Sequence, residues 1–133
     1  MTDAEAAISI ARSFLDLMEA REIDKARALL APDFLAVYPG DRRFTTLEAL
    51  VESGRQRYRG VRKQHDLTLH VPAGDDGIET VIFYGTLKGN WADGSPFEGI
   101  RFTDRFRLRG GLIVEQQVWN DLGEARLRIA GLG

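Results

Sequence analysis

The sequence predicts an α+β fold in which three N-terminal helices pack on a curved antiparallel sheet. Apolar side chains recur at helical spacing in the N-terminal part, whereas the remainder alternates between polar and apolar residues, with glycine-rich turns between the segments. Because the helices precede the long strands and do not alternate with them, we expect no parallel βαβ units. A chain of 133 residues suits one core, so a single domain is expected over residues 1–133.

The apolar spacing and the turn residues place the expected elements along the chain. In the first helix, Ala7, Ala11 and Phe14 share one apolar face. The Gly110-Gly111 pair is expected to form a two-residue turn between the last two strands. We predict helices over residues 3–20, 24–30 and 45–59, a short strand over 34–38, and longer strands over 65–71, 77–89, 96–109 and 112–121.

Composition excludes several classes of protein. Hydrophobic residues make up 44% and charged residues 29%, and the net charge is −2, as in soluble globular proteins. Two groups of basic residues are expected to form a solvated or dimer-pairing face, since no series of aromatic residues is interleaved with them for nucleic-acid binding. They are the cluster Arg55, Arg57, Arg59, Arg62 and Lys63 and the strand residues Arg101, Arg105, Arg107 and Arg109. There is no cysteine, no apolar run of membrane-spanning length and no basic, apolar leader, so a cytoplasmic location is expected.

The strand over residues 96–109 carries the strongest functional signal. Phe102, Asp104, Phe106 and Leu108 alternate with polar residues and therefore share one face. That face is apolar except for one carboxylate. A buried carboxylate must be neutralised, hydrogen-bonded or open to a cavity, because isolated burial of its charge is costly. Asp104 is thus the leading candidate for a catalytic acid, and a structural acid bonded to a neighbouring group is the alternative.

The neighbours of Asp104 depend on the register of the last hairpin. A two-residue turn at Gly110-Gly111 sets Asp104 opposite Gln117 and Phe102 opposite Trp119. A slip by one residue would bring the alternative pair, Gln116 and Asn120, to that face. In the first register, the predicted substrate-binding residues are Phe14, Tyr84, Phe102, Gln117 and Trp119.

The histidines and glycines in the long strands are explained by structural roles. His65 is expected to share the apolar face of Leu67, Leu69 and Val71, and neither histidine has a partner at metal-ligand spacing. We therefore expect no metal and no cofactor. The spacing Gly85-x-x-x-Gly89 lies inside a strand, where a bulge or a close approach of the neighbouring strand explains glycine best.

The order of elements and the late motifs resemble the nuclear transport factor 2-like superfamily, in particular its SnoaL-like branch. The relevant stretches are GTLKGNWADGSPFEG and DRFRLRGGLIVEQQVWNDLG, in which a GT strand, a glycine hairpin and a terminal Trp-x-Asp follow one another. The resemblance implies a cone-shaped half-barrel, an apolar internal cavity and a homodimer formed through the outer face of the sheet.

Within this superfamily, ketosteroid isomerases and polyketide cyclases are similar in the spacing of their site residues. Asp104 matches the aspartic acid that helps to stabilise an enolate oxygen in the isomerases. Phe14 stands at the position of their tyrosine, and Tyr38 at that of their proton-shuttling aspartate. Leu87 occupies the place of the cyclase histidine. Of these positions only Asp104 matches the family's site residue, so it is the catalytic candidate that the resemblance supports. Tyr38 is the second catalytic candidate, as a hydrogen-bond donor, because a phenol is a poor base at neutral pH.

Two functions follow from these residues. The first is a cofactor-independent cyclase, isomerase or dehydratase that binds a small hydrophobic molecule and uses acid–base chemistry at Asp104. The second is a non-catalytic ligand-binding protein or dimeric interaction module in which Asp104 is structural. They differ in whether a cavity of about 300 Å³ or more reaches the carboxylate.

Overall fold

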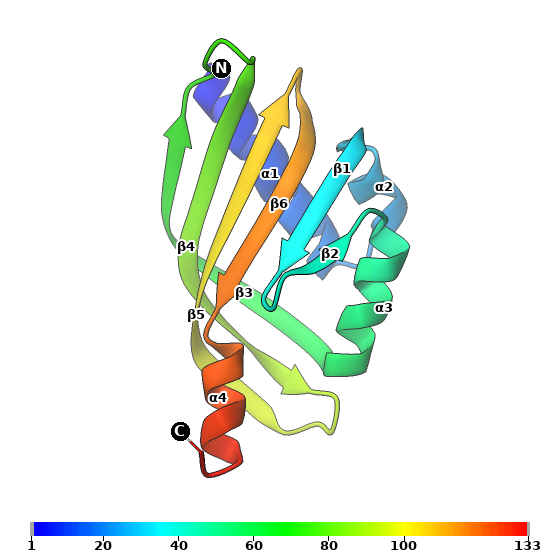
Figure 1. Ribbon diagram of the computed structural model, residues 1–133, viewed down its shortest axis with the longest axis vertical. Helices are drawn as coiled ribbons and strands as arrows, with labels where there is room; N and C mark the ends of the chain where they lie inside the picture. The colour runs from blue at the N-terminus through cyan, green and yellow to red at the C-terminus, as the bar shows by residue number, and fades with distance from the viewer. Residues whose placement is uncertain (1, 133) are drawn as a thin grey trace.

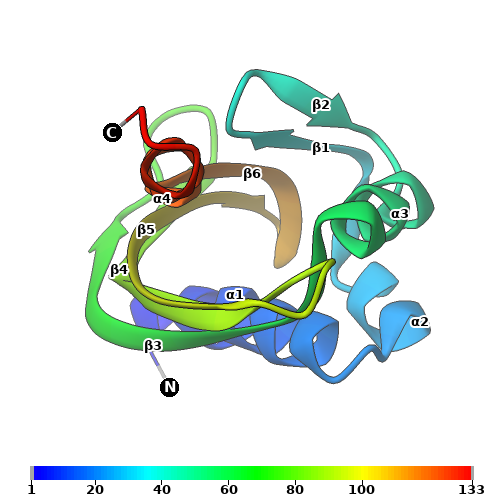
Figure 2. The ribbon, with the colours of Figure 1, turned by 90° about the horizontal axis from the view of Figure 1, so that it is seen from below.

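The computed structural model describes residues 2–132 as a curved, six-stranded sheet with helix α1 against its concave face (Figures 1 and 2). This confirms the predicted α+β class. The sequence analysis did not predict the last helix, α4. The elements are α1 (Asp3–Glu19), α2 (Ile23–Arg27), β1 (Leu30–Tyr38), β2 (Arg42–Phe44), α3 (Leu47–Arg57), β3 (Tyr58–Val71), β4 (Ile78–Trp91), β5 (Pro96–Arg109), β6 (Leu112–Asn120) and α4 (Leu122–Ile129).

The strands follow the order β2-β1-β6-β5-β4-β3. Four of the pairings are antiparallel, but β1 and β6 run parallel, so the sheet is mixed and not antiparallel throughout as predicted. The parallel pairing joins an early strand to the last one, between which lie α3 and the meander of β3, β4 and β5. Local sequence patterns do not report such a pairing, because they specify only neighbouring strands.

Aromatic side chains fill the space between α1 and the concave face of the sheet. The ring of Phe14 from α1 lies 5.9 Å from that of Phe106 on β5 and 6.3 Å from that of Phe34 on β1. Phe106 in turn contacts Phe83 on β4 at 5.9 Å. These four rings are buried, and they fix the helix against three strands of the sheet.

The last hairpin has the predicted turn. Gly110 and Gly111 have φ angles of 60° and 80°, the left-handed conformation that a tight two-residue turn needs. After the first two residue pairs beyond the turn, however, the ladder contains a bulge. Consecutive residues of β5 pair with Ile113 and Glu115, so that Val114 is an extra residue in β6.

The bulge at Val114 shifts the rest of β6 by one position. Asp104 lies opposite Val118 and not opposite Gln117, so the predicted register is wrong. The alternative register, with Gln116 and Asn120 on the inner face, is the one observed. A single extra residue exchanges the two faces of a strand, because successive side chains point in opposite directions.

A second bulge, in β3, separates residues that the sequence placed together. His65 pairs with Gly85 of β4 and Leu67 pairs with the preceding residue there, so Asp66 is the extra residue. His65 therefore faces the interior, whereas Leu67, Leu69 and Val71 face outward and are between 42% and 52% exposed. The expectation that these residues share a face with His65 is therefore wrong, because one extra residue in the strand exchanges its two faces, as it does in β6.

Gly85 lies where β3 and β4 approach most closely, as the glycine spacing predicted. A Cβ atom at this position would lie 1.9 Å from the carbonyl oxygen of Gln64 and 3.0 Å from the ring of Phe102. Because backbone cannot move aside as a flexible side chain does, we expect Gly85→Ala to lower the free energy of unfolding by ~3 kcal/mol in a urea titration.

Gly54→Ala is the matched control, since a Cβ at Gly54 in α3 meets nothing within 4 Å. Alanine is the better helix former, so this variant should gain about 0.5–1 kcal/mol. If Gly85→Ala unfolds at the same urea concentration as the wild type, the close approach of β3 and β4 is not a constraint on the fold.

Candidate functional site

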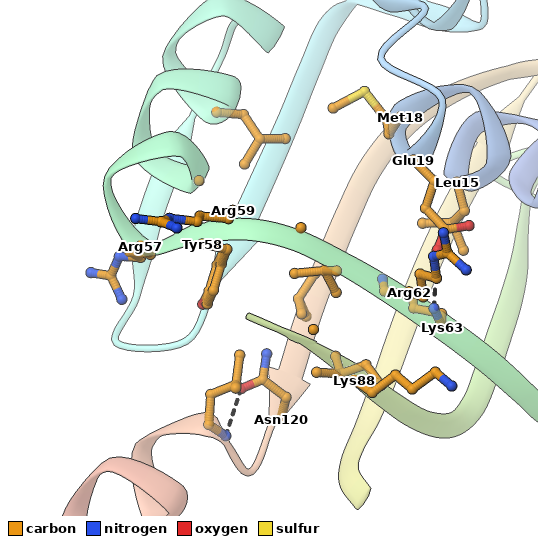
Figure 3. Close-up of a pocket in the computed structure, with 18 of the residues that line it drawn as sticks. Leu15, Met18, Glu19, Arg57, Tyr58, Arg59, Arg62, Lys63, Lys88 and Asn120 are labelled. Atoms are coloured by element: carbon orange, nitrogen blue, oxygen red, sulfur yellow. Dashed lines mark hydrogen bonds between the residues drawn. The ribbon is translucent and has the colours of Figure 1, made fainter. Parts of the chain in front are cut away.

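A pocket of about 1290 Å³ lies between α1, α3 and the inner face of the sheet (Figure 3). One part of its lining is apolar, and another part is polar or charged. The apolar walls include Phe14, Leu15, Met18, Leu50, Val51, Leu87, Phe97, Val118 and Leu122. Polar groups on the inner strands include Tyr38, Arg42, Lys63, Gln116 and Asn120.

Asp104 occupies the middle of the inner face of β5. The face predicted to be apolar is buried, with Phe102 3%, Phe106 0% and Asp104 itself 0% exposed. The carboxylate is thus completely enclosed, and it does not belong to the lining of the pocket. The pocket therefore does not reach Asp104, as the sequence analysis required for direct acid–base chemistry there, and this residue can act on a ligand only through a neighbour. An enclosed carboxylate requires a partner that compensates for its lost hydration.

That partner is Lys63 from β3. Its Nζ atom lies 2.5 Å from Oδ2 of Asp104 and 4.9 Å from the centre of the Phe102 ring. The Lys63 side chain is 16% exposed and belongs to the pocket lining, whereas neither Asp104 nor Phe102, which its ammonium contacts, lines the pocket. The second carboxylate oxygen, Oδ1, has no hydrogen-bond partner among residues 2–132. The site therefore presents a cation whose counter-charge lies behind it.

Two uncharged polar side chains stand on the neighbouring strands. Gln116 on β6 is 1% exposed and lines the pocket. Its amide makes no hydrogen bond of ordinary length within residues 2–132, but it lies near enough to the Tyr38 hydroxyl to oppose the rise in the pKa of that phenol. Burial, followed by the negative charge of Asp104, raises the pKa of Tyr38 on β1 well above its usual value. Tyr38 therefore keeps its proton at neutral pH and can donate a hydrogen bond to a bound molecule.

His65 lies in the apolar surroundings next to this group. Its ring is 5.0 Å from that of Phe83 and 5.6 Å from that of Phe102, and both ring nitrogens are enclosed without a partner among residues 2–132. Burial, together with the positive charges of Arg12 and Lys63, lowers its pKa below the usual value. The imidazole is therefore neutral at pH 7 and does not compete with Lys63 for Asp104.

The structure divides the seven predicted site residues into three groups. Phe14 and Tyr38 line the pocket. Phe102 and Asp104 are buried behind it, next to Lys63. On the outer face of the sheet, away from this group, lie Tyr84, Gln117 and Trp119.

Sequence reasoning missed Lys63, which it had placed in a solvated basic cluster. The signal was its spacing from His65, because residues two apart in a strand share a face and His65 was already expected to point inward. Gln116 was named only as the alternative to Gln117. No local pattern marked the bulge that selects it.

A family model described as the SnoaL-like domain matches residues 11–116. The chain belongs to this family. The match includes Tyr38, Lys63, Asp104 and Gln116, whereas Asn120 of the pocket lining lies beyond it.

Solved structures of similar shape agree with the SnoaL-like fold. An NTF2-like protein of unknown function from Burkholderia pseudomallei K96243 has a TM-score of 0.76 at 17% identity, over 96% of this chain and 97% of that one. A putative SnoaL-like polyketide cyclase from Jannaschia sp. CCS1 has a TM-score of 0.75 at 13% identity, over 96% and 94% of the two chains. TerC, co-crystallized with polyporic acid, has a TM-score of 0.73 at 15% identity, over 91% and 95%. A comparison with curated proteins found no match.

Two further features of the SnoaL-like chain concern membranes and metals. Among residues 2–132, no helix combines the length and the apolar character that crossing a bilayer requires. No three histidine, aspartate or glutamate side chains of the same residues gather into a group that could hold a metal ion.

Mutations of Lys63 and Asp104 should have strongly non-additive effects on the free energy of unfolding, because the two side chains form an ion pair. Lys63→Met leaves an enclosed carboxylate without its counter-charge and should lower the free energy of unfolding by about 3–5 kcal/mol. Adding Asp104→Leu removes the stranded charge, so the double variant should be more stable than Lys63→Met alone. Urea titrations of the two single variants and the double variant measure the coupling. Additive losses would show that the two side chains are independent.

Proposed function

We propose that the pocket binds a small, largely apolar organic molecule and presents an oxygen of that molecule to Tyr38, Lys63 and Gln116. One observation carries this proposal: three strands bring a phenol, an ammonium and an amide to one pocket that also has apolar walls. Organic ligands are commonly held in this way, with apolar contacts for the body and a few polar groups for orientation.

The same groups are suited to acid–base chemistry next to a carbonyl group. A base must take a proton from the carbon beside the carbonyl, and the carboxylate of Glu19, which lines the same pocket, would accept it. The electrons left behind place negative charge on the carbonyl oxygen. Hydrogen-bond donors aimed at that oxygen stabilise the charge, and they act more strongly where water is scarce. Tyr38 and Lys63 are such donors, and Asp104 holds the Lys63 ammonium in position through the 2.5 Å contact. We therefore propose a cyclase, isomerase or dehydratase type of reaction, with Asp104 acting through Lys63.

A neighbour of the same fold supports the choice of ligand. TerC was co-crystallized with polyporic acid, a small organic molecule. The alternative function is ligand binding without catalysis, with Asp104 in a structural role. Both functions use the same pocket, and they differ in whether bound molecules exchange protons.

Deuterium exchange of β-tetralone, a small apolar ketone, tests the proposed function. The protein in D₂O should accelerate exchange of the protons next to the carbonyl, as followed by proton NMR. Tyr38→Phe should slow the protein-dependent exchange by about a hundredfold, the usual cost of losing one donor at a developing oxyanion. Asp104→Asn should also slow it, because Lys63 loses the carboxylate that holds its ammonium in position. Tyr84→Phe is the matched control, because it removes the same hydroxyl from the outer face.

The result separates the two functions. Binding of β-tetralone without faster exchange would leave the non-catalytic function and remove the enzymatic one. Equal losses in Tyr38→Phe and Tyr84→Phe would show that the inner hydroxyl has no special role. Unchanged exchange in Asp104→Asn would take Asp104 out of the chemistry.

We also propose that the chain forms a homodimer through the outer face of the sheet. Five large apolar side chains on β3, β4 and β6 are between 39% and 52% exposed there: Leu67, Leu69, Val71, Tyr84 and Trp119. Three of these five lie in one row across the sheet. Leu67 is opposite Tyr84, and Thr103 lies between Tyr84 and Trp119. A second copy of the chain would remove such a patch from water.

A charge in this row should prevent self-association. Sedimentation velocity is expected to give a dimer for the wild type and a monomer for Trp119→Glu, since the carboxylate would lose its hydration at the interface. Leu127→Glu, at a side chain of similar exposure on α4, should remain a dimer. A monomeric wild type, or a monomer in both variants, would contradict an interface on the sheet face.

A further inference from the structure

Cations without an acidic partner gather around the pocket. Of the eighteen lysines and arginines, eleven form an ion pair with an acidic side chain in residues 2–132. The pocket lining contains six of the other seven, which are Arg21, Arg42, Arg57, Arg59, Arg62 and Lys88. Figure 3 shows Arg57 and Arg59 on one side of Tyr58 and Lys88 on the other. Unpaired positive charge is thus concentrated in the lining of the pocket.

Arg42 is the most firmly held of these cations. Its Nε donates to the carbonyl oxygen of Pro39 at 3.1 Å, and its Nη1 donates to Oγ of Ser53 on α3 at 2.8 Å. The guanidinium also lies 6.0 Å from the centre of the Tyr38 ring. These contacts leave Nη2 without a partner among residues 2–132. The guanidinium is therefore fixed in place and still has donors for a ligand.

Arg57, at the end of α3, places a second positive charge near Arg42. Burial, followed by the charge of Arg57, lowers the pKa of Arg42 from its usual value. Like charges in a partly buried site repel each other, and an anion placed between them would relieve this repulsion.

The acidic residues of the pocket do not supply that anion. Asp16 pairs with Arg12, and Glu19 accepts a hydrogen bond from the backbone nitrogen of Lys63 at 3.0 Å. The third acid, Glu98, forms no ion pair within residues 2–132 and is exposed. The space near Arg42 is therefore positive, while Leu50 and Val51 of α3 provide apolar walls for the same pocket.

We propose that Arg42 and Arg57 form an anion-binding end of the pocket, so that the ligand is an organic acid with an apolar body and a carboxylate. This inference rests on the proposed function, because it specifies the ligand of the same pocket. A guanidinium group is planar and donates two parallel hydrogen bonds to a carboxylate, which makes arginine the preferred partner for this group. Ser53 and Tyr38 hold Arg42 for this contact, and the apolar walls receive the rest of the molecule.

A matched pair of probes tests the charge requirement. β-Naphthoate carries a carboxylate, and β-naphthamide has nearly the same shape without the charge. Calorimetric titration should show that the wild-type protein binds the carboxylate about tenfold more tightly than the amide, as expected for one charge-assisted hydrogen-bonded pair. Raising the salt concentration from ~50 mM to ~500 mM should reduce this preference, since salt screens the attraction.

Three variants locate the preference. Arg42→Gln and Arg57→Gln should each weaken β-naphthoate binding, with Arg42→Gln removing most of the preference, and both should leave β-naphthamide binding unchanged. The unchanged amide affinity shows that the pocket is intact. Arg43→Gln is the control, because Arg43 is the next residue of β2, is exposed, pairs with Asp41 and does not line the pocket.

The outcomes distinguish failure of the anion-binding end from failure of the proposed function. Equal affinity of the wild type for both probes would overturn the anion-binding end and leave the proposed function standing. A preference that survives in both arginine variants would also overturn it. If neither probe binds the wild type, the proposed function fails, and this inference fails with it.

Discussion

The arrangement of the inner face depends on the pairing of one buried carboxylate with one lysine. Asp104 is fully enclosed by aromatic side chains, so its charge is tolerated only because the Lys63 ammonium lies 2.5 Å away. Lys63 must therefore point inward from β3. From Leu67, four residues further along the same strand, apolar side chains point outward, and the bulge at Asp66 reconciles the two orientations. The pairing thus constrains both faces of the sheet.

The polar groups around this pair are costly if they serve structure alone. Within residues 2–132 the Gln116 amide makes no hydrogen bond of ordinary length, with only the Tyr38 hydroxyl near it, and Oδ1 of Asp104 is unpaired. Each unsatisfied buried group costs about 1–3 kcal/mol, a large fraction of the stability of a domain of this size. An apolar residue at Gln116 would avoid that cost. Gln116 belongs to the pocket lining, so a bound molecule can satisfy the amide, which makes ligand binding the simplest account of its presence.

The sequence predicted much of the fold because strong local patterns specify it. Helical spacing, the Gly110-Gly111 turn and the alternation around Asp104 are all properties of neighbouring residues. It did not predict that β1 pairs with β6, because that contact joins segments far apart in the chain. The bulge at Val114 was missed for a different reason, since β-branched residues fit both regular and bulged strands and carry no mark of the extra position.

The candidate site was less predictable than the fold, because it depends on which face each side chain occupies. Asp104 stood out since an acid in an apolar alternation is unusual in any register. Lys63 did not stand out, because a lysine near several arginines resembles a solvated cluster until it is known which face of the sheet its side chain occupies.

In the proposed function, the distribution of charge gives the two ends of the pocket different tasks. At Lys63, a buried acid balances the cation, so this end can stabilise charge that develops during a reaction without attracting a permanent anion strongly. At Arg42, the neighbouring charge is another cation, so this end attracts an anion already present on the ligand. Tyr38 connects the two, since its ring lies beside Arg42 and the charge of Asp104 affects its hydroxyl. A ligand with a carboxylate at one end and a carbonyl at the other would use both. The permanent charge would then fix the orientation in which the carbonyl reaches its donors.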